Sequence, residues 1–348
     1  MRRIARRIAI VGFAALVALA PATAHAADRW FAVPQSVPNS GPAEATPATW
    51  VGAGPGGVYF ATSAALLPED GDSSIDVYRR QGASLTVATP GTTGNVGGPQ
   101  AVSRDGSTVV FSSSEALVPE DQDPDLADLY ATTGGVTRLV SVSDPNAPFS
   151  FLSIILPSLR VSDDGRFVAF STYEGLAASD GDNRFDTYVW DRDTGQTALA
   201  SAPDSGGSDV TLDFGGMSRN GRYVFMETSA PLTSDDTDGA TDVYRYDTSS
   251  DSLALFTPGT TQSYSFAGIS ADGTHLFYRT AESLDTADTD GGQVDVYQYA
   301  NGVTTLISTA PGAASGANDA DFQRASEHGA VVFFTTAEQL TSADVDGG

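Results

Sequence analysis

Aspartates at fixed spacing are the side chains of this sequence that could do chemistry. Two aspartates separated by one residue occur in six similar segments, and in five of these a third aspartate stands six or seven residues after the first. Carboxylates packed this closely repel one another unless a cation or hydrogen-bond donors offset the charge. Calcium prefers oxygen ligands from aspartates and loop carbonyls. The candidate Ca²⁺ ligands are Asp70, Asp72, Asp76, Asp121, Asp123, Asp128, Asp180, Asp182, Asp186, Asp236, Asp238, Asp242, Asp288, Asp290, Asp295, Asp344 and Asp346.

A second interpretation of these aspartates needs no metal. Aspartate side chains also accept hydrogen bonds from nearby backbone N–H groups, form Asx-turns and cap the start of strands. The segment from Asp236 through Asp238 to Asp242 comes nearest to a calcium-binding loop, but it lacks the middle acidic position and the terminal glutamate of such loops. The sequence leaves both interpretations open, and Ca²⁺ is the one cofactor that it suggests.

Other kinds of catalytic site find little support. The two histidines beyond the first 26 residues, His275 and His328, stand in different repeats, and the sequence has neither a cysteine nor a Gly-x-Ser-x-Gly segment. Acidic pairs suited to glycoside hydrolysis do not stand out from the repeated aspartates. We therefore predict no catalytic residues and no enzyme activity for this chain.

The aspartates belong to an internal repeat. Each unit has an apolar run that ends in an aromatic or large apolar residue: Phe60, Phe111, Phe170, Met226, Tyr278 and Phe334. A leucine follows six residues later: Leu66, Leu117, Leu176, Leu232, Leu284 and Leu340. The two aspartates follow at ten and twelve residues, and the third aspartate precedes a strand with a tyrosine: Tyr78, Tyr130, Tyr188, Tyr244 and Tyr297. A period of 52 to 58 residues indicates a repeat architecture.

Each unit reads as four short antiparallel strands. The first two strands are joined by a Ser-x-Asp/Asn-Gly turn such as 103–106 or 162–165, where glycine supplies the positive φ of a tight hairpin. One unit cannot bury both of its faces, so neighbouring units must stack. We predict an all-β fold, a β-propeller of six four-stranded blades with the last one incomplete. The approximate blades are 48–90, 98–143, 157–202, 211–258, 264–310 and, in part, 320–348.

The N-terminal segment reads as a signal peptide. Residues 1–26 combine four arginines, an apolar run at 8–20 and the small residues Ala24 and Ala26 of a cleavage site, and they leave Sec and twin-arginine export open. Residues 27–47 hold a strand at 29–33, which could complete the last blade, and a linker. No later run is long and apolar enough to span a bilayer. We predict a secreted protein, extracellular or periplasmic, without membrane insertion after cleavage.

The charge of the chain limits its partners. The formal net charge is −26, and it becomes more negative once the four leader arginines are removed. Nucleic-acid binding rests on neutralising phosphates, so we predict no nucleic-acid partner. The acidity is compatible with cations and basic partners. We expect a monomer that binds a protein, a peptide or a glycan.

The turn and strand motifs resemble the propeller repeats of the TolB type. That family pairs a Ser-Pro-Asp-Gly turn and an apolar strand with an Asp-Ile-Tyr-like strand, and the likeness covers about residues 48–342. Here the turn proline is replaced by Arg104, Asp163, Arg219, Ala271 or Glu327, and the acidic loop is added. The resemblance implies a six-bladed, secreted binding scaffold without naming its ligand. Together with the absence of a catalytic motif, it favours a non-catalytic scaffold. The alternative is the propeller portion of a longer secreted or surface hydrolase or lyase, whose catalytic domain lies outside this chain.

Overall fold

The computed structural model describes residues 9–12, 48–89, 96–122, 127–144, 159–181, 184–203, 213–257, 262–310, 316–341 and 343. Their regular structure is entirely strand. The helices that would be needed to cross a membrane are therefore not found in these ranges.

The strands form six antiparallel sheets, five of them with four strands in sequence order. The first strands are β2 (Thr49–Gly54), β6 (Val96–Val102), β10 (Leu159–Val161), β14 (Asp213–Met217), β18 (Ser265–Ile269) and β22 (Ala320–Ala325). The second strands are β3 (Gly57–Thr62), β7 (Thr108–Ser113), β11 (Phe167–Thr172), β15 (Tyr223–Thr228), β19 (His275–Thr280) and β23 (Val331–Thr336). The third strands are β4 (Asp76–Gln81), β8 (Asp128–Thr133), β12 (Asp186–Asp191), β16 (Asp242–Asp247) and β20 (Asp295–Ala300). The fourth strands are β5 (Ser84–Val87), β9 (Val136–Leu139), β13 (Gln196–Leu199), β17 (Ser252–Leu255) and β21 (Val303–Leu306).

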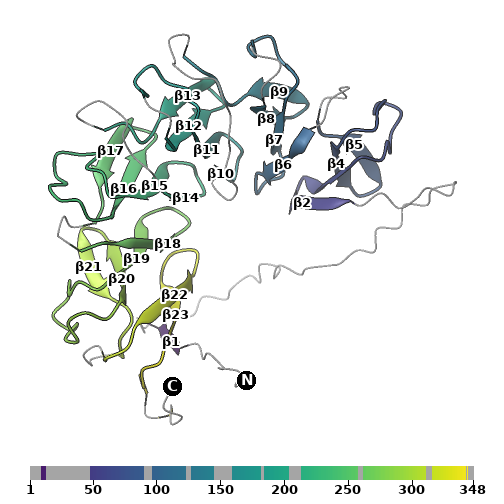
Figure 1. The fold of residues 1–348 in the computed structure, drawn as a ribbon. Helices are drawn as coiled ribbons and strands as arrows, with labels where there is room; N and C mark the ends of the chain where they lie inside the picture. Colours follow the sequence, from purple (N-terminus) through teal and green to yellow (C-terminus); the bar gives the residue numbers. More distant parts are fainter. Residues whose placement is uncertain are drawn as a thin grey trace, which may run out of the picture.

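The sheets follow one another as blades of a β-propeller, which confirms the predicted fold class. Figure 1 shows the six blades along an arc, with the first blade (β2 to β5) at one end and the sixth (β22 and β23) at the other. Successive first strands contact one another along the arc, from β2 and β6 through to β18 and β22.

The hydrophobic core lies between blades. The second and third strands bury both faces, as in Phe111 and Tyr130, which are 0% exposed and face each other across β7 and β8. One cluster joins Val110 and Leu129 of the second blade to Phe170 and other residues of the third. This packing explains the apolar runs in the sequence, because a blade in the middle of the row has a neighbour on each side.

The sixth sheet differs from its prediction. It contains β22, β23 and a third strand, β1 (Ala9–Gly12), which pairs antiparallel with β23 (Figure 1). The sequence analysis assigns these four residues to the signal peptide, and that assignment stays a prediction. The strand predicted at 29–33 lies outside the described residues.

Each blade has two unlike ends. The Ser-x-Asp/Asn-Gly turns lie at one end, here called the turn end, and the acidic loops and the links between blades lie at the other, the loop end. The turn glycines have the predicted positive φ: 69° at Gly106, 68° at Gly165, 73° at Gly221, 70° at Gly273 and 70° at Gly329.

Backbone hydrogen bonds connect successive blades at the turn end. The N–H of Asp105 donates to the carbonyl of Asp163 at 2.9 Å, and the N–H of Asp163 donates to the carbonyl of Arg219 at 2.6 Å. Arg219 donates to Ala271 and Ala271 donates to Glu327, both at 2.7 Å. Asp163, Arg219 and Ala271 each directly follow the turn serine, and a proline at these three positions would have no N–H to donate to the next blade.

Candidate cation site in the acidic loops

The acidic loop begins with a tight turn after the second strand. In the first blade the N–H of Asp70 donates to the carbonyl of Leu67 at 3.1 Å, and in the third blade Asp180 donates to Ala177 at 3.0 Å. The same bond joins Asp236 to Thr233 at 3.2 Å. This turn directs the first aspartate of each loop back toward its own blade.

The first aspartate is bound by the tyrosine of the third strand. The tyrosine hydroxyl donates to the carboxylate in five blades: Tyr78 to Asp70, Tyr130 to Asp121, Tyr188 to Asp180, Tyr244 to Asp236 and Tyr297 to Asp288. The N–H of the loop leucine donates to the same hydroxyl, at 3.0 Å for Leu66 and Tyr78. Burial, and then the bonded carboxylate, raise the pKa of Tyr78, so its hydroxyl stays protonated and donates. The spacing of these tyrosines in the sequence did not indicate this contact.

The second aspartate forms Asx-turns in two blades. Asp72 Oδ1 accepts from the N–H of Ser74 at 2.6 Å, and Asp238 Oδ1 accepts from the N–H of Ala240 at 2.7 Å. Backbone turns therefore use one oxygen of each carboxylate. Asp290 of the fifth blade differs, because both of its side-chain oxygens are buried without a hydrogen-bond partner. Asp123, Asp182, Asp344 and Asp346 lie outside the described residues.

The third aspartate is held by a hydroxyl that follows the fourth strand. Asp242 Oδ1 accepts from the Thr257 hydroxyl at 2.7 Å, and the N–H of Val243 donates to that hydroxyl oxygen at 3.0 Å. The same pair occurs in every four-stranded blade: Thr89 with Asp76, Ser141 with Asp128, Ser201 with Asp186, Thr257 with Asp242 and Ser308 with Asp295. The sequence analysis missed these hydroxyls, although each stands two residues after its fourth strand.

The second oxygen of the third aspartate lacks a donor in two blades. Asp242 is 0% exposed and Asp295 is 2% exposed, yet Oδ2 of each is buried without a hydrogen-bond partner. An ionised carboxylate buried in this way is costly unless something compensates its charge.

The three aspartates of a loop converge. In the first, fourth and fifth blades each aspartate offers one oxygen, and within a blade these oxygens all lie within 4.8 Å of one another. The clusters are Asp70, Asp72 and Asp76; Asp236, Asp238 and Asp242; and Asp288, Asp290 and Asp295. The structure thus brings together nine of the predicted ligands, in three groups whose oxygens lie close enough to contact one cation.

The electrostatics of the clusters favour a positive charge. Burial raises the pKa of Asp242 to about 6 in spite of its bond to Thr257, and the carboxylates of Asp236 and Asp238 add to the rise. Burial and neighbouring carboxylates likewise raise the pKa of Asp295 to about 6. A bound cation would reverse both effects, because it stabilises the ionised form of every carboxylate around it.

No protein-family model matches the chain, and no curated protein matches it. Solved structures of propeller-containing peptidases do match. A chain from a structural study of two prolyl endopeptidases matches at 14% identity over 80% of this chain and 38% of its own, with a TM-score of 0.42. The β-propeller domain of the Trilobed protease from Pyrococcus furiosus matches at 9% identity over 80% of this chain and 75% of its own, with a TM-score of 0.41. Dipeptidyl peptidase 4 from Porphyromonas gingivalis matches at 14% identity over 78% of this chain and 39% of its own, with a TM-score of 0.47.

The chain spans about two fifths of the length of the first and third of these proteins. At 9 to 14% identity and TM-scores of 0.41 to 0.47, the likeness assigns neither an activity nor a ligand to this chain. The geometry of the loops is therefore the basis for a functional proposal.

Proposed function

We propose that this chain is a secreted, non-catalytic β-propeller scaffold whose acidic loops bind Ca²⁺ and order the loop end for a protein, peptide or glycan ligand. The observation that carries the proposal is the buried oxygen without a donor on Asp242 and on Asp295, each within a cluster of three carboxylates. Asx-turns and hydroxyl partners account for the hydrogen-bonded oxygens but leave these two, and both oxygens of Asp290, without compensation.

Calcium fits these clusters better than magnesium. Ca²⁺ accepts six to eight oxygen ligands in flexible geometry and uses loop carbonyls and carboxylates together. Mg²⁺ demands a near-octahedral shell and gives up its water reluctantly. A loop that offers three carboxylates close together matches the first ion.

The ligand surface would be the loop end. The acidic loops and the links between blades meet there, so a cation that orders one loop also shapes the surface around it. We keep the TolB-type family, secretion and the monomeric state as parts of this proposal. N-terminal sequencing of the exported protein tests secretion, and we expect the mature chain to begin at Ala27.

Thermal unfolding with excess Ca²⁺, excess Mg²⁺ or a chelator tests the proposal. Free Ca²⁺ at about 100 times its dissociation constant adds about 2.7 kcal/mol per site to the free energy of unfolding. We expect Asp242→Asn and Asp295→Asn, combined, to reduce the Ca²⁺-dependent shift of the midpoint. Asp272→Asn, at an exposed turn-end carboxylate, is the matched control and should leave that shift unchanged. A wild-type midpoint that Ca²⁺ and chelator leave equal would contradict the proposal.

A second proposal is that the chain is the propeller portion of a longer secreted or surface hydrolase or lyase. The solved structures that match the chain come from peptidases, and the chain spans 38 and 39% of two of them. Peptidase assays on the full-length product of the gene test it. Cleavage that is lost when a nucleophile outside these 348 residues is substituted would support this second proposal.

A further inference from the structure

The sixth blade has a segment of the predicted signal peptide in the place of its third strand. β1 pairs antiparallel with the edge of β23, and Ala9 lies opposite Phe334. In the third blade the corresponding partner of Phe170 is Tyr188, which belongs to the third strand of the same blade. Removal of the signal peptide on export would take β1 away and leave the N–H and carbonyl groups of this edge unpaired. An unpaired edge is a template for another strand.

Second strands follow one rule at the interfaces between blades. The third residue of each second strand lies in one hydrophobic cluster with the fourth residue of the second strand in the next blade. Five such pairs occur: Tyr59 with Phe111, Val110 with Phe170, Ala169 with Met226, Phe225 with Tyr278, and Phe277 with Phe334. Successive side chains of a strand point to opposite faces, so one face of a blade meets the blade before it and the other meets the blade after it.

This rule assigns two apolar residues to the two ends of the arc. Phe333 is the third residue of β23, so it points away from the fifth blade, and Phe60 is the fourth residue of β3, so it points away from the second blade. Phe333 is half-buried, whereas Phe277 at the same position of β19 is 0% exposed. The sixth and first blades lie at opposite ends of the row (Figure 1). Phe333 and Phe60 are therefore the pair that would form a further interface of the same kind.

Residues 28–33 have the sequence of a third strand. Third strands begin with an aspartate, any residue and an aromatic residue, and Asp28-Arg-Trp30 repeats this pattern. In each four-stranded blade the leading aspartate lies opposite a hydroxyl residue that ends the second strand: Thr62 with Asp76, Ser113 with Asp128, Thr172 with Asp186, Thr228 with Asp242, and Thr280 with Asp295. β23 likewise ends in Thr336. Pairing Asp28 with Thr336 sets a register in which Trp30 lies opposite Phe334.

We propose that residues 28–33 of the exported chain pair with the edge of β23 as the third strand of the sixth blade. The completed sixth blade then meets the first, Phe333 packs against Phe60, and the arc closes into a ring. The inference goes beyond the proposed ligand binding. It rests on one part of the proposed function, the removal of the signal peptide.

The segment 28–33 fits this edge better than β1 does. Trp30 places an aromatic side chain opposite Phe334, as the tyrosines of the other third strands do, whereas the signal peptide places Ala9 there. Residues 34–48 then connect the added strand to β2. A chain of this length reaches about 50 Å when extended, and packed sheets lie about 10 Å apart, so the connection can join neighbouring blades. Because the strand belongs to the same chain, its effective concentration exceeds that of a strand from a second copy.

A disulfide between the two strands tests the proposal. The chain has no cysteine, so no native thiol competes with a pair introduced by Arg29→Cys and Thr335→Cys. These residues lie opposite each other in the proposed register, and antiparallel partners have Cα atoms about 4.5–5.5 Å apart, which a disulfide spans. We expect the mature chain, residues 27–348, to form this bond within one molecule on oxidation. Arg29→Cys with Val331→Cys is the matched control and should stay reduced, since Val331 lies about 13 Å further along β23.

Hydrogen exchange provides a second measurement that needs no new bond. A chain that begins at Pro34 lacks the added strand, so the edge amides of β23 should lose their protection from exchange relative to the mature chain. Amides of β15 in the fourth blade are the control and should exchange at the same rate in both chains. The shortened chain should also have a larger radius of gyration in solution scattering, because its ring would open.

The outcomes separate this inference from the proposed function. A disulfide that links two molecules would assign the edge to a second copy and overturn the inference. A cysteine pair that stays reduced, or edge amides equally protected in both chains, would assign the edge to another segment and overturn it as well. N-terminal sequencing that finds the signal peptide retained would overturn both the proposed secretion and the added strand. A chain that forms the disulfide and binds no Ca²⁺ would overturn the proposed cation sites alone.

Discussion

Aspartates at the two ends of the blades have opposite properties. At the turn end Asp272 accepts from the hydroxyl of Ser270 at 2.6 Å and from the N–H of Thr274 at 3.1 Å. The Ser270 bond is the main cause that lowers the pKa of Asp272 to about 2. At the loop end Asp242 also has a hydroxyl partner, yet burial raises its pKa to about 6. Both residues are aspartates, so their surroundings decide whether the pKa rises or falls.

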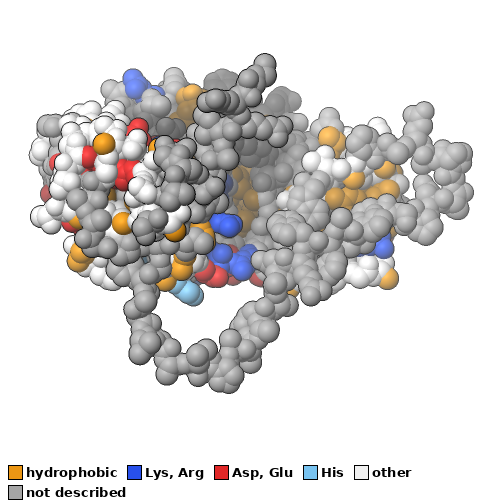
Figure 2. All heavy atoms as spheres, turned by 90° about the horizontal axis from the view of Figure 1, so that it is seen from below, with side chains coloured by type: hydrophobic (Ala, Val, Ile, Leu, Met, Phe, Trp, Pro, Cys, Tyr) orange, Lys and Arg blue, Asp and Glu red, His pale blue; other side chains and the backbone are white. Residues whose placement is uncertain are grey.

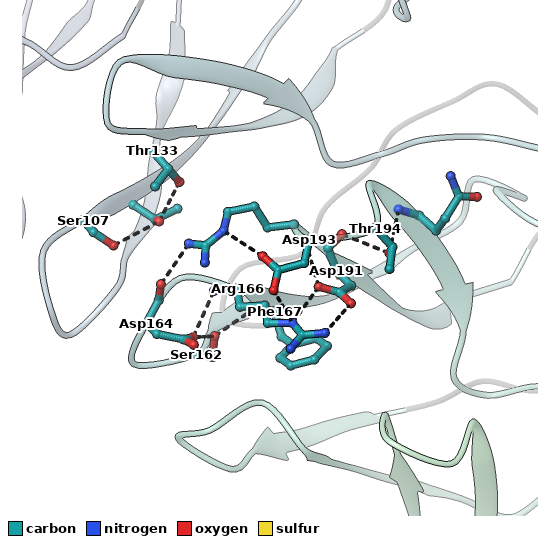
Figure 3. A network of polar contacts seen from close by, with 12 residues as sticks. Ser107, Thr133, Ser162, Asp164, Arg166, Phe167, Asp191, Asp193 and Thr194 are labelled. Carbon is teal, nitrogen blue, oxygen red and sulfur yellow. Dashed lines mark hydrogen bonds and ion pairs between the residues drawn. The ribbon is translucent and has the colours of Figure 1, made fainter.

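The difference lies in how many donors the carboxylate meets. Figure 3 shows the turn end of the third blade, where Ser162 donates to Asp164 and Arg166 forms two bonds of 2.9 Å to Asp191. Figure 2 shows basic and acidic side chains next to a histidine, and the two described histidines, His275 and His328, both belong to the turn end. The turn end therefore supplies positive charges as well as neutral donors, whereas the hydrogen bonds described above for the loop aspartates come only from neutral hydroxyl and N–H groups.

This comparison supports the proposal that the loop end binds a cation, because the turn end compensates the charge of its own aspartates. A carboxylate with enough donors is a structural element and needs nothing from solution. Buried carboxylates that lack donors are destabilising until a proton or a cation reaches them. Four experiments test this difference between the two ends, in order of decreasing effect.

The largest effect concerns pH in metal-free protein. Asp242 and Asp295 have pKa values of about 6 in the fold against 3.8 as the ordinary value, so the folded state binds more protons than the unfolded chain between these limits. Their ionisation destabilises the fold above pH 6, and stability rises as the pH falls toward 4. At about 1.4 kcal/mol per pKa unit, each contributes about 3 kcal/mol.

Urea unfolding in chelator at pH 7 and pH 5 measures the first part of this rise, about 1.4 kcal/mol per group, because one pKa unit separates pH 5 from the folded pKa of about 6. Asp242→Asn and Asp295→Asn should abolish this rise in stability. Asp272→Asn should leave the rise unchanged, because Asp272, with a pKa of about 2, is ionised at both pH values. With Ca²⁺ present the trend should reverse, since protons compete with the metal for the same carboxylates. A metal-free chain that loses stability between pH 7 and pH 5 would refute the assigned role of these two aspartates.

Gly165→Ala tests whether the turn end is complete by itself. Gly165 has a φ of +68°, and a Cβ there would lie 2.1 Å from Thr108 Oγ1 of the neighbouring blade. Left-handed backbone strain and overpacking together should cost about 2–4 kcal/mol. Gly134→Ala is the control, since its φ is +57° with nothing within 4 Å, and should cost about 1–2 kcal/mol. Chemical unfolding should show the same loss with Ca²⁺ and with chelator.

Tyr244→Phe tests the bond that holds the first aspartate. The variant leaves the buried carboxylate of Asp236 without its hydroxyl donor and the N–H of Leu232 without its acceptor. We expect a loss of about 1–3 kcal/mol in the free energy of unfolding. Tyr173→Phe, at a tyrosine 41% exposed, should change it by less than about 0.5 kcal/mol. Equal effects of the two substitutions would show that the Tyr244 hydroxyl does not stabilise the loop.

The fold follows from the sequence largely through local rules. Alternating apolar strands, Asp-Gly and Asn-Gly turns and a fixed period specify four-stranded blades, because each device acts within a few residues. The register of Phe170 opposite Tyr188 was predictable in the same way, since both residues hold the same place in every unit. Pairing of Ala9–Gly12 with β23 was not predicted, because nothing in a leader-like sequence indicates a partner 320 residues away.

The site was predicted less completely. Aspartate spacing identified the clusters, but the hydroxyls of Thr257 and Ser308 were missed. These hydroxyls follow the fourth strand, and the aspartates that they bind begin the third strand. The contacts therefore depend on how the strands pair, and the apolar pattern of the sequence does not indicate them. The donor count that separates Asp272 from Asp242 is likewise a property of the folded surroundings and is invisible in an Asp-rich sequence.

The smallest expected effect concerns the ion pairs at the turn end. Glu327 of the sixth blade pairs with Arg219 of the fourth and lies 3.8 Å from Arg104 of the second, so charges from three blades meet. The side chains of Arg104, Arg219 and Glu327 are 38 to 54% exposed, and exposed pairs of this kind contribute less than about 1 kcal/mol. Glu327→Gln should therefore lower the free energy of unfolding by less than that, with a loss that shrinks further in high salt. Thermal unfolding at low and high salt checks both expectations. A loss of several kcal/mol would mean that these charges, and not the backbone bonds beneath them, hold the blades together at this end.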